Sequence, residues 1–184
     1  MPFSISDFRS SGLKQSGARP NLFDVAVVGA PDQGSDVKST EFTMLCKIAS
    51  VPTSTVGVIE VPYFGRMVKI PGNRTFDNLS VTVINDEDFK IRNGVEKWRD
   101  SLNSHESNKS KIGGAASTTN LSGTIVVNHY KRDGEPTPSE SWTFVNCYQV
   151  ALGEIGLDWG SNDTIEEFTI DWAYDYWTHG EFTS

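Results

Sequence analysis

The chain has 184 residues, of which 16 are Lys or Arg and 24 are Asp or Glu, so its formal net charge is −8. A chain of this length buries about 70% of its extended surface, which disfavours the disulfide-scaffold and disordered classes and predicts a single domain over residues 1–184. The charge is uneven: residues 1–132 sum to +3, whereas residues 133–184 contain 11 acids and no base. The overall excess of acids disfavours ordinary nucleic-acid binding.

No run of about 18 apolar residues occurs, so we expect neither a membrane span nor a membrane anchor. The N-terminal residues Met1–Asp7 lack the basic and apolar regions of a signal peptide, and we therefore expect synthesis and residence in the cytoplasm. Cys46 and Cys147 are the only cysteines, and each lies in an alternating apolar run. This position predicts two buried free thiols.

Residues 1–20 are rich in Ser and Gly with isolated apolar side chains, which predicts an N-terminal arm that orders only against another surface. After this segment apolar residues recur at every second position, so Phe23, Val25 and Val27 share one face of a predicted strand. The segment 29–41 follows as a polar loop, which we expect to be mobile.

Alternating apolar residues over Phe42–Ile48 predict a second strand, which ends before Pro52. The stretch 53–74 contains short β-prone pieces separated by prolines and glycines. Because proline cannot donate to an inner ladder, we expect exposed edge structure or a long excursion here.

A clear strand pattern at Leu79–Val83 leads into the one convincing helix. Asn85 can cap this helix, and the acids at 86–88 suit the positive end of its dipole. The apolar residues at helical spacing are Ile91, Val95, Trp98 and Leu102.

Residues 103–123 are polar and small, which predicts a second mobile loop. The last third returns to strands, marked by Ile125, Val127 and His129, then by Trp142, Phe144, Asn146 and Tyr148, and then by Ile155 and Leu157. The final strand pattern places Phe168, Ile170, Trp172, Tyr174 and Tyr176 on one face and Thr169, Asp171, Ala173 and Asp175 on the other. Six or more strands with one helix predict a mainly β fold, an antiparallel β-sandwich or small barrel with one flanking α-helix.

The sequence offers no pattern for chemistry. His105, His129 and His179 stand apart, so they do not form a zinc motif. No nucleophile elbow is present, and no Gly-rich phosphate loop opens the helix. The adjacent Glu166 and Glu167 point to opposite faces of a strand, which disfavours a catalytic carboxylate pair. We therefore expect no enzyme activity, no metal and no cofactor.

The tryptophans have two interpretations, either a sugar-stacking face like that of carbohydrate-binding modules or a mixture of core and subunit interface. The residues concerned are Trp142, Trp159, Trp172 and Trp177. Trp172 is in phase with Phe168, which favours the core for this side chain. Trp177 falls on the opposite face, which favours a subunit interface.

One long segment, Ile59–Asp77, reads IEVPYFGRMVKIPGNRTFD and continues into Val81–Glu87. Together these segments resemble the tail tube proteins of contractile-tailed bacteriophages of the T-even type. Ala18–Phe23 and Gly153–Asp163 agree as well, with Phe168 and Asp175–Trp177. The motifs Gly-x-Arg-Thr-Phe-Asp, Thr-Val-x-Asn-Asp-Glu and Leu-Asp-Trp-x-Ser-Asn fall in the family's order. The loops 29–41 and 103–123 depart from the family pattern, so contacts made by those loops are not carried over.

The resemblance implies a structural virion protein and no catalytic site. Members of the family are β-sandwiches with a helix on one side, which form a hexameric ring whose inner strands join into one barrel. Rings stack into the inner tube of the contractile tail, a conduit for genome ejection into the host. The implied partners are further copies of the chain, the tail sheath protein, the tape-measure protein in the lumen, the baseplate tube initiator and the tail terminator. DNA passes through without sequence-specific binding, and assembly takes place in the host cytoplasm.

Closing strands across subunits would abolish the sheet edges that Pro62 and Pro71 otherwise only blunt. The candidate subunit-interface residues are Tyr63, Phe64, Arg66, Arg74, Phe76 and Trp177. For the turn at 73–77 two alternatives stay open: Arg74 pairs with an acid of an adjacent subunit while Phe76 anchors in that subunit's core, or the turn is intramolecular.

Asp171 and Asp175 are the candidates for an acidic surface that faces the lumen, the sheath or the next ring. A conduit for DNA must not retain its cargo, so we expect few unpaired Lys or Arg in the lumen. A baseplate tube initiator or the ring protein of a type VI secretion system would share the fold and differ in stacking. A monomeric carbohydrate-binding sandwich is the alternative from another class.

Overall fold

The computed structural model describes residues 17–110 and 121–180. The elements in chain order are β1 (Phe23–Val28), η3 (Asp32–Lys38), α2 (Thr40–Leu45), β2 (Cys46–Ser50), β3 (Ser54–Tyr63), β4 (Arg66–Phe76), β5 (Leu79–Ile84), α3 (Lys90–Leu102), β6 (Gly123–His129), β7 (Glu140–Leu152), β8 (Glu167–Ala173) and β9 (Tyr176–His179). The predicted N-terminal arm, apart from residues 17–20, and positions 111–120 of the predicted loop 103–123 lie outside the described residues.

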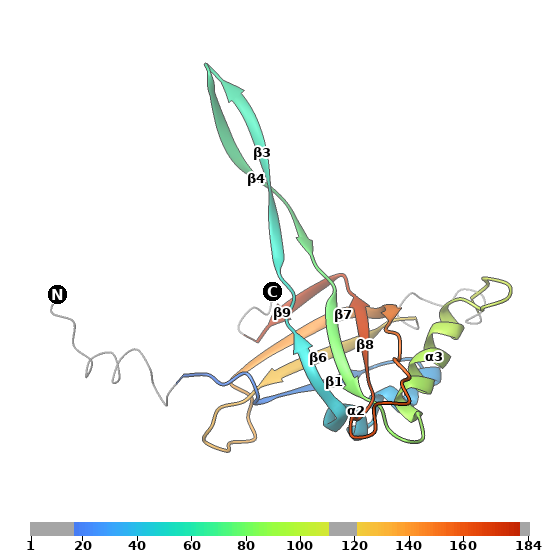
Figure 1. Cartoon of the computed structure of the whole chain (residues 1–184). Coiled ribbons are helices and arrows are strands. Elements are labelled where there is room, and N and C mark those ends of the chain that lie inside the picture. The colour runs from blue at the N-terminus through green and yellow to red at the C-terminus, as the bar shows by residue number, and fades with distance from the viewer. Residues whose placement is uncertain (1–16, 111–120, 181–184) are drawn as a thin grey trace.

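The strands form an antiparallel arrangement of two layers that share β7. Sheet I consists of β1, β6, the first half of β7 and β9, and sheet II consists of the second half of β7, β8, β5 and β2. Between the two halves of β7, Asn146 has a left-handed φ of 57°, which fits a change of direction at the junction. Figure 1 shows the strands of the two sheets crossing each other. The predicted mainly β, antiparallel fold with one main helix is therefore confirmed.

The core lies between the two sheets and is closed by α3. Sheet I and sheet II contribute the apolar side chains at alternate positions that the sequence predicted, all buried: Val25, Val27, Ile125, Val127, Phe144, Leu79, Val81, Val83, Phe168, Ile170 and Trp172. From α3, Trp98 packs 5.4 Å from the ring centroid of Trp172 and donates its indole N–H to the Leu121 carbonyl at 3.0 Å. Trp172 is thus a core residue, as predicted.

The strand predicted over Phe42–Ile48 is wrong in its first half. Residues 40–45 form α2, and Ser39 caps its N-terminus, since the Ser39 hydroxyl accepts from the Phe42 amide at 3.3 Å. Phe42 is buried, whereas Met44, two residues on, is 77% exposed. The Ser39 cap favours a helix over residues 40–45, where the alternation of only two apolar residues had indicated a strand. Residues 46–50 alone form the strand β2.

The helix that was predicted to follow Asn85 begins later, at Lys90 in α3. The Asn85 side chain does not cap it, because its amide donates to the Glu166 carboxylate at 2.5 Å. Phe89 precedes the helix in a left-handed conformation, with a φ of 53°. The predicted buried face is confirmed, since Ile91, Val95 and Trp98 are all buried.

Two further expectations are corrected. The segment 29–41, predicted as a loop, contains the short helix η3 and the start of α2, and Val37 is fully buried. Residues 153–166, which include the strand predicted at Ile155 and Leu157, form no strand and connect β7 to β8 as an irregular loop.

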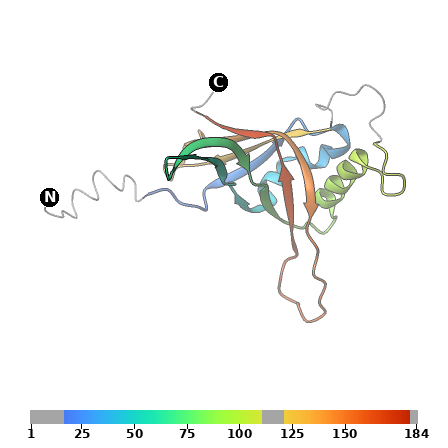
Figure 2. The same ribbon diagram turned by 90° about the horizontal axis from the view of Figure 1, so that it is seen from above.

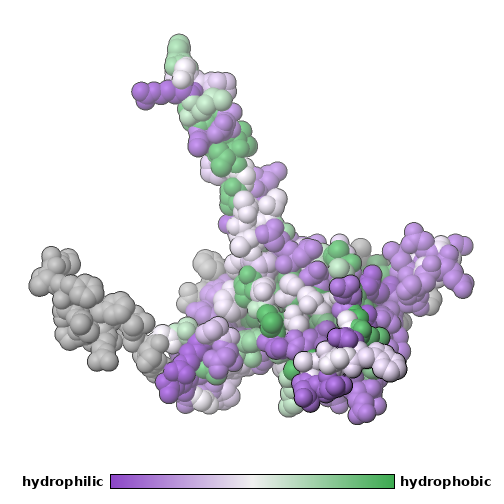
Figure 3. Space-filling model, viewed as in Figure 1, coloured by the Kyte–Doolittle hydropathy of each residue, from purple (hydrophilic) through white to green (hydrophobic). Residues whose placement is uncertain are grey.

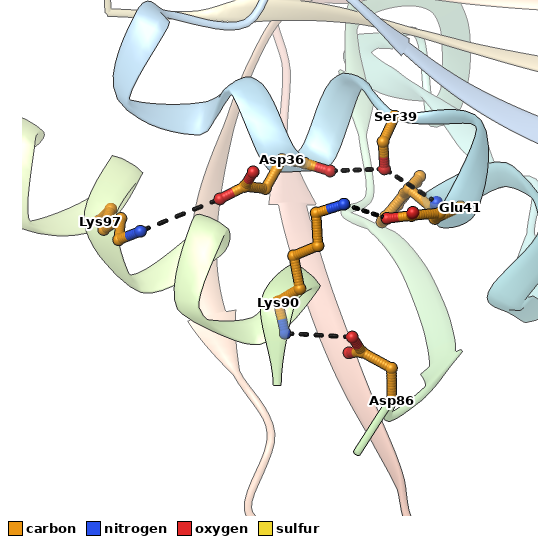
Figure 4. Close-up of polar contacts among 7 residues, drawn as sticks. Asp36, Ser39, Glu41, Asp86, Lys90 and Lys97 are labelled. Carbon is orange, nitrogen blue, oxygen red and sulfur yellow. Dashed lines mark hydrogen bonds and ion pairs between the residues drawn. The ribbon is translucent and has the colours of Figure 1, made fainter. Parts of the chain in front are cut away.

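Helices η3, α2 and α3 are linked by polar contacts on the surface (Figure 4). The Lys90 ammonium lies 2.5 Å from the Glu41 carboxylate, and the Lys90 amide donates to Asp86 at 3.3 Å. The hydrogen bond with Glu41 is the main cause that raises the pKa of Lys90. Such exposed pairs add little to stability because solvent screens them, so these contacts orient the helices more than they stabilise them.

Both cysteines are free. Cys147 is buried and Cys46 is half-buried, so the prediction holds for the first and only partly for the second. Burial raises the pKa of each thiol to about 12, so both are protonated and unreactive at neutral pH. Among the described residues, no helix is long and apolar enough to cross a membrane.

Candidate assembly interface

Strands β3 and β4 form a long hairpin that projects from the two-sheet body (Figure 1). We call residues 54–76 the hairpin arm and the other described residues the body. The arm turns at Phe64 and Gly65, whose φ values of 43° and 78° both lie in the left-handed region. A two-residue turn with two positive φ angles matches the twist of antiparallel strands. The predicted long excursion over 53–74 is confirmed as one continuous hairpin.

The two prolines of the arm occupy positions that cost the hairpin nothing. In a hairpin with a two-residue turn, the pair beside the turn exchanges hydrogen bonds, and alternate pairs do so from there. That pair is Tyr63 and Arg66, so Pro62 and Pro71 fall at positions whose N–H would point outward. Each outer edge of the arm therefore lacks one donor, which blunts unspecific strand addition.

One face of the arm is aliphatic and does not belong to the buried core of the chain. The register places Ile59 opposite Ile70 and Val61 opposite Val68 on the same face, and we call these four residues the aliphatic face. They are between 43% and 54% exposed, and Figure 3 shows hydrophobic surface along the arm. A two-stranded hairpin without cover is only marginally stable in water. The aliphatic face is therefore built to be covered by another surface.

The base of the arm is fixed to the body through aromatic packing and hydrogen bonds. The ring of Phe76 lies 6.0 Å from that of Tyr174, which in turn lies 4.9 Å from buried Phe144. The Tyr174 hydroxyl donates to the Asp77 carbonyl at 2.7 Å, and Thr53 donates its hydroxyl to the Asp77 carboxylate. Burial, followed by the charge of Asp77, raises the pKa of Tyr174 to about 12. These contacts set the direction in which the arm leaves the body.

The predicted interface residues are spread along the arm. Tyr63 and Phe64 lie at its tip, where their rings pack edge to face at 4.7 Å and Phe64 is 92% exposed. Among the described residues, neither Arg66 at the tip nor Arg74 near the base has an ion-pair partner. Phe76 packs within its own chain, so the intramolecular alternative describes that residue, whereas Arg74 remains free for a partner.

Trp177 packs against the core of its own chain, contrary to the predicted outward position. The chain changes from β8 to β9 at residues 174–175, which shifts the phase of the alternation, and β9 places Trp177 opposite Phe144. A role of Trp177 in an interface stays a prediction.

The two acidic candidates lie in different places. Asp171 is half-buried on the outward face of sheet II, opposite Ser80 of β5. Asp175 is exposed at the junction of β8 and β9, where its carboxylate accepts from the Asn146 amide at 2.5 Å. They therefore do not form one acidic patch within a single chain.

The outward face of sheet I is almost free of charge. The residues that point away from the core are Asp24, Ala26, Val28, Thr124, Val126, Asn128, Ser141, Thr143, Val145, Tyr176 and Thr178. None of them is Lys or Arg, and the one acid, Asp24, accepts from Asn128 at 2.8 Å and from the Tyr130 hydroxyl at 2.6 Å. The bond with Asp24 is the main cause that raises the pKa of Tyr130.

Both borders of sheet I are open edges within the described chain, because β1 pairs only with β6 and β9 pairs only with β7. Open edges are usually covered or paired in the assembled protein. The sequence predicted the strands but not their order in the sheet, because pairing between distant segments leaves no local sequence pattern. The aliphatic face did have a signal, namely the mirrored alternation of Ile59-Glu60-Val61 and Val68-Lys69-Ile70 about the turn.

The described residues contain no group of three or more His, Cys, Asp or Glu side chains that could hold a metal ion. The features that lack an explanation within the single chain are the aliphatic face, the free arginines and the open edges of sheet I. All three are suited to contacts between protein chains.

Comparison with known proteins identifies relatives that are tail tube proteins of bacteriophages. The family model for the phage tail tube protein matches residues 18–180. The chain is 32% identical over 160 residues to tail tube protein gp19 of Enterobacteria phage T4, covering 87% of this chain and 90% of that one. It is 26% identical over 172 residues to the tail tube protein of Serratia phage KSP90, covering 93% and 94%.

Solved structures of contractile injection systems have the same fold. One, in an extracellular contractile injection system, is described as a sheath/tube terminator in the extended state and has a TM-score of 0.60 at 18% identity, covering 89% of this chain and 96% of that one. Another is a sheath-tube complex of such a system, with a TM-score of 0.56 at 17% identity and coverage of 96% and 97%. With a family model that spans nearly the whole described region, the chain belongs to the phage tail tube protein family.

Proposed function

We propose that this virion protein builds the inner tube of a contractile tail from stacked hexameric rings and that the tube is the conduit for genome ejection. The observation that carries the proposal is the hairpin arm, which holds four aliphatic side chains away from the body with nothing in its own chain to cover them. An element of this kind is stable and useful only when another copy covers it.

Sheet I supports the ring. Its open edges on β1 and β9 allow the sheet to continue into neighbouring copies, and closure into one barrel removes both edges. Its outward face carries no base, which suits a lumen wall, because a wall with exposed cations would retain DNA phosphates. We infer that this face lines the lumen.

The partners follow from the tube. The structures with the same fold include a sheath/tube terminator and a sheath-tube complex, and we propose that this tube likewise lies inside a sheath and ends at a terminator and a baseplate initiator. Before DNA enters, the lumen would hold the tape-measure protein, and assembly would take place in the host cytoplasm. The role is structural and involves no catalysis.

The experiment is electron microscopy of the purified protein in negative stain. We expect long hollow tubes of uniform diameter, because a contact between unlike surfaces that does not close on itself produces a filament. Stacks that stop after a small number of rings would identify an initiator instead. Featureless monomers at every concentration would contradict the proposal.

A further inference from the structure

Residues 153–166, which we call the acidic loop, connect β7 to β8 and extend away from the body (Figure 2). Its two ends are fixed. The Gly153 carbonyl accepts from Arg92 of α3 at 3.2 Å, and the Glu166 backbone and side chain both bond to Asn85, at 2.9 and 2.5 Å. The loop is therefore a positioned element of the body.

The acidic loop exposes large apolar side chains in an acidic setting. Leu157, Trp159 and Ile165 are 84%, 102% and 72% exposed. The loop contains Glu154, Asp158, Asp163 and Glu166 and no base. Of the carboxylates, those of Glu154 and Asp163 have no hydrogen-bond or ion-pair partner among the described residues.

The hairpin arm is complementary to the acidic loop in both respects. The arm carries three bases, Arg66, Lys69 and Arg74, against one acid, Glu60, and its uncovered face is aliphatic. Lys69 and Glu60 lie 3.9 Å apart, whereas the two arginines have no partner. A basic, aliphatic strand pair and an acidic loop with an exposed indole are suited to each other by charge and by apolar surface.

The two elements of one chain do not meet. The arm rises from the body in Figure 1, and the acidic loop extends from another side of the body in the view of Figure 2. An arm can therefore reach only the loop of a different copy, which makes the contact heterologous.

We propose that the hairpin arm of one copy docks its aliphatic face on the acidic loop of a second copy, with Arg66, which shares that face opposite Tyr63, next to Glu154 and Asp163. The inference rests on the proposed tube, and it adds which surface of the neighbour receives the arm. Trp159, fully exposed in the single chain, is then the anchor of the contact.

The test is a charge-reversal cycle on the full chain, read as the concentration at which tubes form in electron microscopy and sedimentation. Arg66→Glu, and separately Glu154→Lys with Asp163→Lys, each place like charges at the contact. Each of these two variants should raise that concentration at least about tenfold. The three changes combined restore opposite charges and should bring that concentration back to within about threefold of the unmodified protein.

The matched control is Asp133→Lys with Glu135→Lys, which makes the same charge change on the exposed β6–β7 connection and should leave tube formation unchanged. All these side chains are exposed, so circular dichroism should show folded protein in every variant. A combined variant that assembles no better than the Arg66 variant or the loop variant would overturn the inference, as would a control that is equally impaired. If the unmodified protein forms no tubes, the proposed function itself fails. If it forms tubes but the cycle shows no rescue, only the docking inference fails.

Discussion

The body and the hairpin arm share the same alternation of apolar side chains, but these side chains are buried in the body and exposed in the arm. In the body, alternate side chains such as Val81, Phe144 and Trp172 meet an opposing layer and are fully buried. In the arm, Ile59 and Val61 alternate with polar or constrained neighbours in the same way, yet no residue of either strand of the arm is buried. The difference is what lies opposite each strand, and it separates residues that fold the chain from residues that we infer assemble it.

The largest effect is expected from a change in the body. Trp172→Ala removes a buried ring that packs on Trp98 and should lower the free energy of unfolding by about 3–5 kcal/mol. Chemical denaturation followed by circular dichroism measures it. An effect below about 1 kcal/mol would show that the two sheets do not share the core described above.

Alkaline conditions should also act on the body. Burial raises the pKa of Cys46 and Cys147 from 9.0 to about 12, so the folded state holds these protons more tightly than the unfolded state. The stabilisation is complete below pH 9 and is lost as the pH rises towards 12, and the loss is larger for buried Cys147 than for half-buried Cys46, where solvent reduces the effect. Denaturation midpoints between pH 8 and 11.5 should fall, and less steeply in Cys147→Ala. A midpoint independent of pH would contradict the burial of the thiols.

In the arm the expectation is reversed. Val61→Asp with Val68→Asp places two charges on the aliphatic face and should raise the concentration needed for assembly by about a hundredfold or more. The free energy of unfolding of the body should change by less than about 0.5 kcal/mol, because neither side chain belongs to its buried core. The control is Val58→Asp with Met67→Asp, which places two charges at exposed apolar positions on the other face of the arm. Assembly that survives the first pair would break the distinction between the two regions.

The smallest effect is expected where the regions join. Tyr174→Phe removes the hydroxyl that donates to the Asp77 carbonyl but keeps the ring between Phe76 and Phe144. We expect a loss of about 0.5–1.5 kcal/mol in stability and a modest loss of assembly, because the arm leaves the body less firmly directed. Tyr148→Phe, which removes a hydroxyl from a partly exposed tyrosine of β7 outside the arm, is the matched control and should change neither quantity.

The alternation of apolar residues along the sequence was sufficient to predict most of the strands of the body. Strands β1, β5, β6 and β8 and the buried face of α3 follow directly from the spacing of apolar residues. The alternation was misleading at residues 40–45, where the Ser39 cap favours the helix α2. The predicted cap at Asn85 was wrong because its side chain bonds to Glu166, a residue distant in the sequence. The alternation was also misleading at 153–166, where Ile155 and Leu157 alternate without a strand to pair with.

The interface was predicted less completely for the same physical reason. The resemblance drew attention to Tyr63, Phe64, Arg66, Arg74 and Phe76, and the structure places all five on one projecting hairpin. The aliphatic face and the base-free face of sheet I depend on register and strand order, which arise from contacts between distant segments. Asp171 and Asp175 were paired by sequence phase and are separated by the break between β8 and β9.

The most direct measurement is a cryo-electron microscopy map of tubes formed by the purified protein. We predict that a neighbouring copy covers Ile59, Val61, Val68 and Ile70 and that the outward face of sheet I lines the lumen. A tube in which the hairpin arm projects freely into solvent, or in which Lys and Arg dominate the inner wall, would contradict this prediction.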